Sequence, residues 1–286
     1  MLVKTFHDNA TATFTHVVVD ESTKKCAVID SVLDYDHFSG AVKTSSADAV
    51  IAYIKDHDLT NEWILESHIH ADHITASSYL KTHIGGQTAM GKGIKDVLAI
   101  WVPMFSNQAD TPITGEQFDR LLDEGDTISI GNITLTTWLT PGHTPACASY
   151  YCAEHQAIFV GDTMFAPHLG TARCDFPGGS AADLFNTVQR FYTLPDSTQV
   201  YLCHDYPDEG EAAVAVVSIA DEKAHNIQIK PDTVFAEYVK KREARDATLA
   251  VPRLLFPSIQ TNMRLGDFGV KSDNGLQYIK IPVNAL

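Results

Sequence analysis

Positive charge is scarce in this sequence. Its 286 residues include 21 Lys and Arg against 36 Asp and Glu, which gives a formal net charge of −15. Phosphate backbones and anionic lipids repel such a chain, so we expect neither nucleic acid nor a membrane as its main partner. An anionic ligand would need cations gathered in a local pocket. No stretch approaches the roughly 20 apolar residues of a membrane span, and the N-terminal residues lack the apolar run of a signal peptide. We therefore expect a cytoplasmic protein.

Cysteines are few, and their spacing forms no motif. The five cysteines are odd in number and include no CxxC, which predicts reduced thiols packed as small apolar residues. Cys174 follows Arg173, and a neighbouring positive charge generally makes a thiol more reactive. We nevertheless interpret Cys174 as a spectator.

The chain also lacks repeats, low-complexity stretches and any linker rich in Pro, Gly or Ser. Its hydrophobic content of 44% is ordinary for a globular protein, and its length is sufficient to bury a core. We predict a catalytic core at 1–225, with a C-terminal helix and strand at 226–286 packed on the same domain.

The hydrophobic pattern predicts an α/β protein. β-branched runs around polar turns indicate hairpins at 14–32 and 126–140, and "EWILES", "QAIFVGD" and "QVYLCHD" are typical of buried strands. The final "LQYIKIPV" is also strand-like. Helical spacing is found at 47–59, 76–86, 180–193, 209–225 and 232–246. Hairpins followed by alternating strands and helices predict layered sheets covered by helices.

The segment "ESHIHADH" places three histidines and an aspartate directly after a predicted buried strand. His68 and His70 would point the same way, because side chains alternate along an extended chain. Asp72 and His73 are expected at the start of the following helix. Four costly polar groups at the end of an apolar strand need a common purpose, whereas we interpret isolated histidines such as His16 and His168 as ordinary surface or core residues.

Three later strands end in the same kind of residue. "TWLTPGH" ends at His143, "AIFVGD" at Asp162 and "QVYLCH" at His204. If these strands share one sheet edge with the histidine cluster, all of these side chains converge there. Neutral imidazoles combined with carboxylates suit zinc, iron or manganese. The sequence therefore predicts a metal site at this edge.

The motifs "HIHADH", "TPGHT", "GDT" and "CHDY", in this order, resemble the metallo-β-lactamase superfamily. That resemblance implies an αββα sandwich with the metal site at the sheet edges. "GDTMFAPHLGTARCDFPGG", "LCHDYP", "REARDATL" and "IKIPVNAL" look more specifically like the persulfide dioxygenase (sulfur dioxygenase) branch, which includes bacterial β-lactamase-hydrolase-like proteins.

The dioxygenase resemblance implies one Fe(II) per chain, held by His68, His143 and Asp162 as a two-His-one-carboxylate triad. This would leave three positions for water, dioxygen and a substrate sulfur. The remaining ligand-type residues would be outer residues or a vacant second site: His70, Asp72, His73 and His204. From the residues alone a pair of zinc ions remains open, because every hydrolase ligand is present.

The implied reaction is the oxidation of glutathione persulfide by O₂ and water to sulfite and glutathione, a step of sulfide detoxification. Glutathione carries two carboxylates, so we expect Arg173 and Tyr206 to bind the substrate. The basic run at 240–245 is a weaker candidate, since such runs are usually solvated helix faces. A homodimer remains open.

Three other functions compete with this one. A dinuclear zinc thioester hydrolase of the glyoxalase II type shares the ligand set, but "TARCDFPGG" and the strand-like C-terminus differ from what that enzyme would have. A β-lactamase would need an export signal. A metal-dependent binding or regulatory protein is disfavoured by the intact ligand set at a Gly-rich cleft, and no helix-turn-helix with a basic face is visible.

Overall fold

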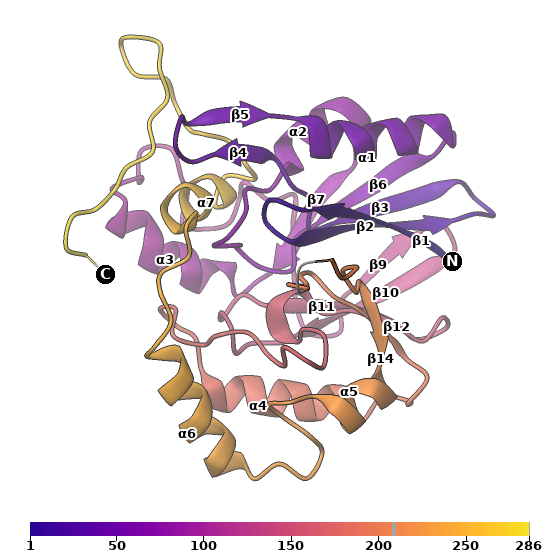
Figure 1. Ribbon diagram of the computed structural model, residues 1–286. Coiled ribbons are helices and arrows are strands. Elements are labelled where there is room, and N and C mark those ends of the chain that lie inside the picture. Colours follow the sequence, from indigo (N-terminus) through magenta and orange to yellow (C-terminus); the bar gives the residue numbers. More distant parts are fainter. Residues whose placement is uncertain (208–209, 286) are drawn as a thin grey trace.

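The computed structural model describes residues 1–207 and 210–285. Two six-stranded sheets pack face to face, and helices cover their outer surfaces (Figure 1). This four-layer arrangement confirms the αββα sandwich that the sequence motifs imply. Among the described residues, no helix combines the length and the apolar character needed to cross a membrane.

The first sheet has the order β1-β2-β3-β6-β7-β8. Its first three strands are antiparallel, and β3, β6, β7 and β8 are paired in parallel. The strands are β1 (Leu2–Asp8), β2 (Thr13–Asp20), β3 (Lys25–Ile29), β6 (Thr60–Leu65), β7 (Gln87–Gly91) and β8 (Arg120–Leu122). Along β2, Val17 and Val19 pack towards the helices whereas Val18 packs between the sheets, as alternation along a strand requires.

The second sheet has the order β14-β13-β12-β11-β10-β9, and only β12 and β13 are paired in parallel. Its strands are β9 (Thr127–Ile130), β10 (Ile133–Leu139), β11 (Ala148–Cys152), β12 (Ala157–Phe159), β13 (Gln199–Tyr201) and β14 (Val216–Ser218). A small separate hairpin consists of β4 (Asp34–Asp36) and β5 (Ala41–Lys43). The two hairpins expected at 14–32 and 126–140 are both present, as β2–β3 and β9–β10.

Helices cover each sheet on its outer face (Figure 1). On the side of the first sheet lie α1 (Ser45–Asp56), α2 (Ser77–Ile84), α3 (Ile94–Met104) and α7 (Leu255–Asn262). On the side of the second lie α4 (Ala181–Phe191), α5 (Ile219–His225) and α6 (Phe235–Asp246). Helix α4 shows why these segments are helical: Leu184, Val188 and Phe191 share one buried face. The side chain of Ser180 caps its first turn by accepting from the Asp183 N–H at 3.1 Å.

Three details of the predicted secondary structure are wrong. The helix expected at 209–225 begins only at Ile219, and residue 209 lies outside the described residues. Val216 and Val217 pair with β13 instead, and a capping box between Ser218 and Asp221 starts α5. Asp72 and His73 lie in a loop, because α2 begins at Ser77. "LQYIKIPV" forms no strand in the described part of the chain; at Lys280 the segment is hydrogen-bonded to the Gln260 side chain of α7.

The helices of the C-terminal segment pack against the rest of the protein. Tyr238 of α6 is buried in the same hydrophobic cluster as Leu184 of α4, and Ile259 of α7 is buried with Leu98 of α3. The boundary at 225/226 stays a prediction.

Glu222 of α5 gives the fold a testable dependence on pH. Its side chain is fully buried and accepts a hydrogen bond from Asn226 Nδ2 at 2.7 Å. Burial raises the pKa of Glu222 to about 8. The folded state therefore holds this proton more tightly than the unfolded state, so the contribution to stability is largest at acidic pH and is lost as pH rises through about 8.

We expect Glu222→Gln to raise the midpoint of thermal unfolding more at alkaline than at mildly acidic pH, because glutamine keeps the shape and the acceptor without a charge to bury. Unfolding curves of both proteins at about pH 6 and about pH 9 measure the difference. An equal change in midpoint at the two pH values would contradict the assignment.

Candidate metal centre

The predicted ligands come together where several strands end. The loop after β6 carries His68, His70, Asp72 and His73, and the segments after β10, β12 and β13 carry His143, Asp162 and His204. Parallel strands β12 and β13 bring their carboxyl ends to the same edge of the second sheet. Gly161 permits the close approach of the two sheets here. It has a φ of 54°, and an added Cβ would lie 2.5 Å from Ser67 Oγ.

His68, His143 and Asp162 form the first group, in which one ligand atom of each lies within 4.8 Å of the others. Asp162 Oδ2 is 3.7 Å from His68 Nε2 and 3.8 Å from His143 Nε2, and all three residues are buried. His143 Nδ1 lies 2.6 Å from the carbonyl oxygen of Arg173. Because a carbonyl only accepts, Nδ1 carries the proton and Nε2 presents its lone pair to the site. Ser67 Oγ lies 3.0 Å from His68 Nδ1, and its hydroxyl could donate or accept this hydrogen bond.

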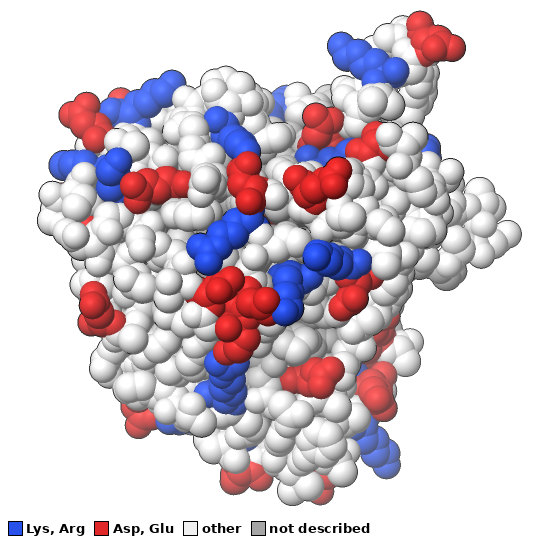
Figure 2. Space-filling view, turned by 180° about the vertical axis from the view of Figure 1, so that it is seen from behind, with Lys and Arg blue, Asp and Glu red and all other residues white. Residues whose placement is uncertain are grey.

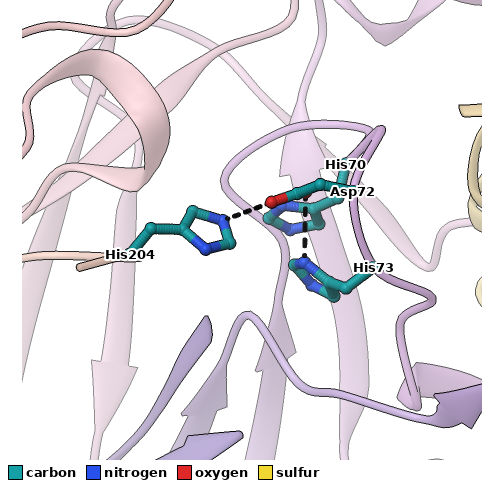
Figure 3. Close-up of side chains that lie close together, drawn as sticks. All are labelled: His70, Asp72, His73 and His204. Atoms are coloured by element: carbon teal, nitrogen blue, oxygen red, sulfur yellow. Dashed lines mark ion pairs between the residues drawn. The ribbon is translucent and has the colours of Figure 1, made fainter. Parts of the chain in front are cut away.

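The second group contains His70, Asp72, His73 and His204, whose ligand atoms also lie within 4.8 Å of one another. Asp72 lies between two of these histidines (Figure 3): its Oδ2 is 3.2 Å from His204 Nε2, and its Oδ1 is 3.4 Å from His73 Nδ1. His204 Nε2 is also 3.3 Å from Asp162 Oδ1. The two groups are therefore adjacent, with the Asp162 carboxylate between them.

His70 differs from the other histidines because two buried carboxylates hold it. Its Nε2 lies 3.2 Å from Asp30 Oδ1 and 3.3 Å from Glu66 Oε2. Burial alone would lower the pKa of His70, but the charges and hydrogen bonds of these two residues raise it well above its usual value. These contacts occupy Nε2 of His70 and tie it to the residues that follow β3 and β6, so only its Nδ1 is left to face the other histidines.

Several buried polar atoms of the site have no hydrogen-bond partner among the described residues. They are Nε2 of His68, Nε2 of His73, Nε2 of His204, Nδ1 of His70 and Oδ1 of Asp162. Leaving a buried polar group unpaired costs roughly 1–3 kcal/mol, so a cluster of five is typical of residues that bind a cation. Burial also keeps the pKa of His68 well below its usual value and lowers that of His73. Neutral imidazoles and a carboxylate are the donors that iron, zinc or manganese binds, and the residues therefore fit a metal.

A cavity of about 400 Å³ opens beside the first group. His143 and Asp162 form part of its lining, and apolar walls come from Phe165, Leu169, Phe176, Leu249 and Pro252. Its cations are Arg173, Arg242 and Arg245. Arg242 and Arg245 belong to the basic run at 240–245, and Arg242 is buried. Elsewhere the charges are mixed: Figure 2 shows acidic and basic side chains interspersed over one face.

Arg173 and Tyr206, the predicted substrate-binding residues, both line this cavity. The Arg173 guanidinium donates two hydrogen bonds to Asp175 and one to the carbonyl of Ala250, at 2.6 to 2.7 Å. The Tyr206 ring is stacked with that of His204 at 5.9 Å between ring centroids, and the residue is half-exposed.

All five cysteines are free and buried, which confirms their prediction as packed thiols. Burial raises the pKa of Cys174 above its usual value despite the adjacent arginine. A thiol of this kind is a poor nucleophile.

The fold agrees with comparisons to known proteins. The sequence profile of the metallo-beta-lactamase superfamily matches residues 10–204, which are 195 of the 286 residues. The chain therefore belongs to the metallo-β-lactamase superfamily, and it is an enzyme of that superfamily.

Similar proteins carry both hydrolase and dioxygenase names. Glyoxylase B2 of Dictyostelium discoideum is 45% identical, over 99% of this chain and 97% of that protein. A beta-lactamase hydrolase-like protein of Xylella fastidiosa is 40% identical, over 99% of this chain and 65% of that protein. Human persulfide dioxygenase ETHE1 is 27% identical, over 93% of this chain and 89% of that protein. The crystal structure of ETHE1 from Myxococcus xanthus superposes with a TM-score of 0.74 at 27% identity, over 93% of this chain and 100% of that one.

Proposed function

We propose that this enzyme is a mononuclear iron persulfide dioxygenase, acting in the cytoplasm on glutathione persulfide. One O₂ and one water supply the three oxygens of sulfite, the S–S bond breaks, and glutathione leaves as the thiol. The observation that carries the proposal is the division of the histidines. His68 and His143 face Asp162, whereas Asp30 and Glu66 hold His70 at its Nε2. The likeness to persulfide dioxygenases over most of the chain supports it.

In this proposal His68, His143 and Asp162 would hold one Fe(II), and the second group would hold no metal. Bound iron would supply a centre at which the persulfide sulfur and O₂ meet. The protein's own part is to hold these groups in place. The Arg173 carbonyl fixes the tautomer of His143, and Ser67 holds His68. The apolar walls of the cavity exclude bulk water from the reacting sulfur.

The cavity also suits an anionic, peptide-sized substrate. A volume of about 400 Å³ lies in the range of small-molecule sites. Arg173 uses three of its five N–H donors within the protein, so two remain for a carboxylate or for the persulfide anion. Tyr206 adds a hydroxyl at the same cavity. Arg173 thus supplies positive charge at the cavity, although the chain as a whole has a net charge of −15.

We expect Arg173→Ala to raise the KM for glutathione persulfide roughly 10- to 100-fold while the iron content stays near that of the wild type, because charge-assisted hydrogen bonds contribute about 1.5–3 kcal/mol. The backbone carbonyl that holds His143 remains in this variant. Steady-state kinetics and metal analysis measure the two quantities.

Lys241→Ala is the matched control, since it removes a cation from α6 that does not line the cavity. Loss of iron from Arg173→Ala with an unchanged KM would mean that Arg173 supports the metal ligands and does not bind substrate.

A second candidate is a dinuclear zinc thioester hydrolase of the glyoxalase II type. The observation in its favour is the completeness of the second group, His70, Asp72, His73 and His204. Two assays on anaerobically purified protein separate the candidates: O₂ consumption with glutathione persulfide, and hydrolysis of a glutathione thioester. We expect the first reaction with iron and not the second.

A further inference from the structure

Two buried polar side chains of the C-terminal segment reach the loops that carry the metal ligands. Asn262 is the last residue of α7, and Asp246 is the last residue of α6. Both follow residue 204, where the match to the superfamily profile ends. Their exposed fractions are only 2% and 3%, so water does not replace the hydrogen bonds that they make.

Asn262 binds the loop of the histidine cluster through all parts of its amide. Its Nδ2 donates to the carbonyl of His70 at 2.9 Å and to the carbonyl of His73 at 2.8 Å. Its Oδ1 accepts from the N–H of Thr75 at 2.9 Å. This loop runs between β6 and α2 with a single isolated β-bridge, at Ile74. Asn262 therefore supplies hydrogen bonds that a sheet or helix would supply elsewhere.

Asp246 acts on the opposite side of the site, through the segment at 171–174. Its Oδ2 accepts from the backbone N–H of Cys174 at 2.8 Å, and its Oδ1 accepts from Arg242 Nε at 2.9 Å. The residue before Cys174 is Arg173, whose carbonyl holds His143 Nδ1 at 2.6 Å. Arg242 also donates to the carbonyl of Thr171 at 3.3 Å. Helix α6 thus fixes the peptide that orients a predicted metal ligand.

We propose that Asn262 and Asp246 are positioning residues of the metal centre, which act through the loop at 70–75 and through the Arg173–Cys174 peptide. The C-terminal segment then completes the site from outside the common superfamily domain. Outer groups of this kind change metal affinity by roughly 10- to 100-fold when they are removed. The proposal concerns metal binding and holds whichever reaction the enzyme performs.

The test of Asp246 uses two double variants that both remove the buried charge pair, so neither leaves an unpaired charge. Arg242→Met with Asp246→Asn keeps an acceptor for the Cys174 N–H, whereas Arg242→Met with Asp246→Leu does not. Asparagine and leucine have similar shapes, so the pair differs mainly in that acceptor. The probe is Co²⁺ bound to the full-length protein, followed by its ligand-field absorption and by its rate of transfer to a chelator.

We expect the leucine variant to release Co²⁺ roughly 10- to 100-fold faster than the asparagine variant, with a shifted absorption spectrum. Thermal unfolding of the metal-free proteins shows how much of any difference is a general loss of stability. Equal release rates and identical spectra would overturn the role of Asp246.

Asn262→Asp gives an independent test on the other loop. The aspartate keeps an acceptor for Thr75 but turns an oxygen towards the carbonyls of His70 and His73. The control is Thr261→Val, a buried neighbour whose hydroxyl bonds to the carbonyls of Pro257 and Ser258 within α7. We expect faster Co²⁺ release and a changed spectrum for Asn262→Asp alone. If both variants behave alike, or if release follows only the stability of the metal-free protein, Asn262 is not a positioning residue.

Discussion

His68→Ala, His143→Ala and Asp162→Ala should each abolish both iron binding and O₂ uptake with glutathione persulfide. The three side chains form one buried group within 4.8 Å, and the two that remain after any substitution cannot retain a labile ferrous ion. The measurements are iron per chain in protein purified without oxygen, and O₂ consumption by the same samples.

His155→Ala is the control for these variants, since His155 is exposed and lies outside every candidate metal group of the described residues. It should keep both iron and turnover. Full iron content and activity in any one of the three ligand variants would show that the triad is wrongly assigned.

The convergence of these candidate ligands could be predicted because their signal is local in sequence. The HxHxDH cluster occupies six consecutive positions shortly after an apolar strand. His143, Asp162 and His204 each lie shortly after another strand. Strand ends of a sandwich meet at its edges, so residue type and local pattern together were sufficient. The resemblance to a family then specified the order of the layers.

The residues that hold these ligands could not be found in the same way. Asn262 is 192 positions from His70 and 187 from Thr75, and Cys174 is 72 positions from Asp246. Asn262 and Asp246 are each a single polar residue at the end of an ordinary helix, and only the fold brings them to the site. Asp30 and Glu66 ended strand-like runs without any recognisable motif. Their burial against His70 depends on the pairing of β3 with β6.

Two of the wrong predictions of secondary structure have a common cause, which is that tertiary contacts override local preference. Residues 216–218 lie in a stretch read as helical, yet their backbone completes the edge of the second sheet beside β13. The apolar alternation of "LQYIKIPV" suggested a strand, but in the structure the segment is hydrogen-bonded to the Gln260 side chain of α7 at Lys280. Tertiary context decided both.

His73→Ala should leave most of the iron in place and lower turnover by roughly 10- to 100-fold, as expected for a residue that orients other groups. The reason is the position of His73 in the second group, where its Nδ1 lies 3.4 Å from Asp72 and 3.3 Å from Thr13 Oγ1. In a one-iron enzyme this group holds no metal of its own. Wild-type protein should accordingly contain one metal per chain.

The dinuclear alternative makes the opposite prediction for the same samples. There His73 would be a direct ligand, and His73→Ala would lose one of two metals together with nearly all turnover. Two measurements on the wild type and on His73→Ala distinguish the one-iron enzyme from the dinuclear one. They are metal content per chain, and activity with glutathione persulfide and with a glutathione thioester. Two metals per wild-type chain, with zinc supporting thioester hydrolysis, would defeat the dioxygenase assignment and establish the hydrolase. One iron per chain in both proteins is the result that the division of the histidines predicts.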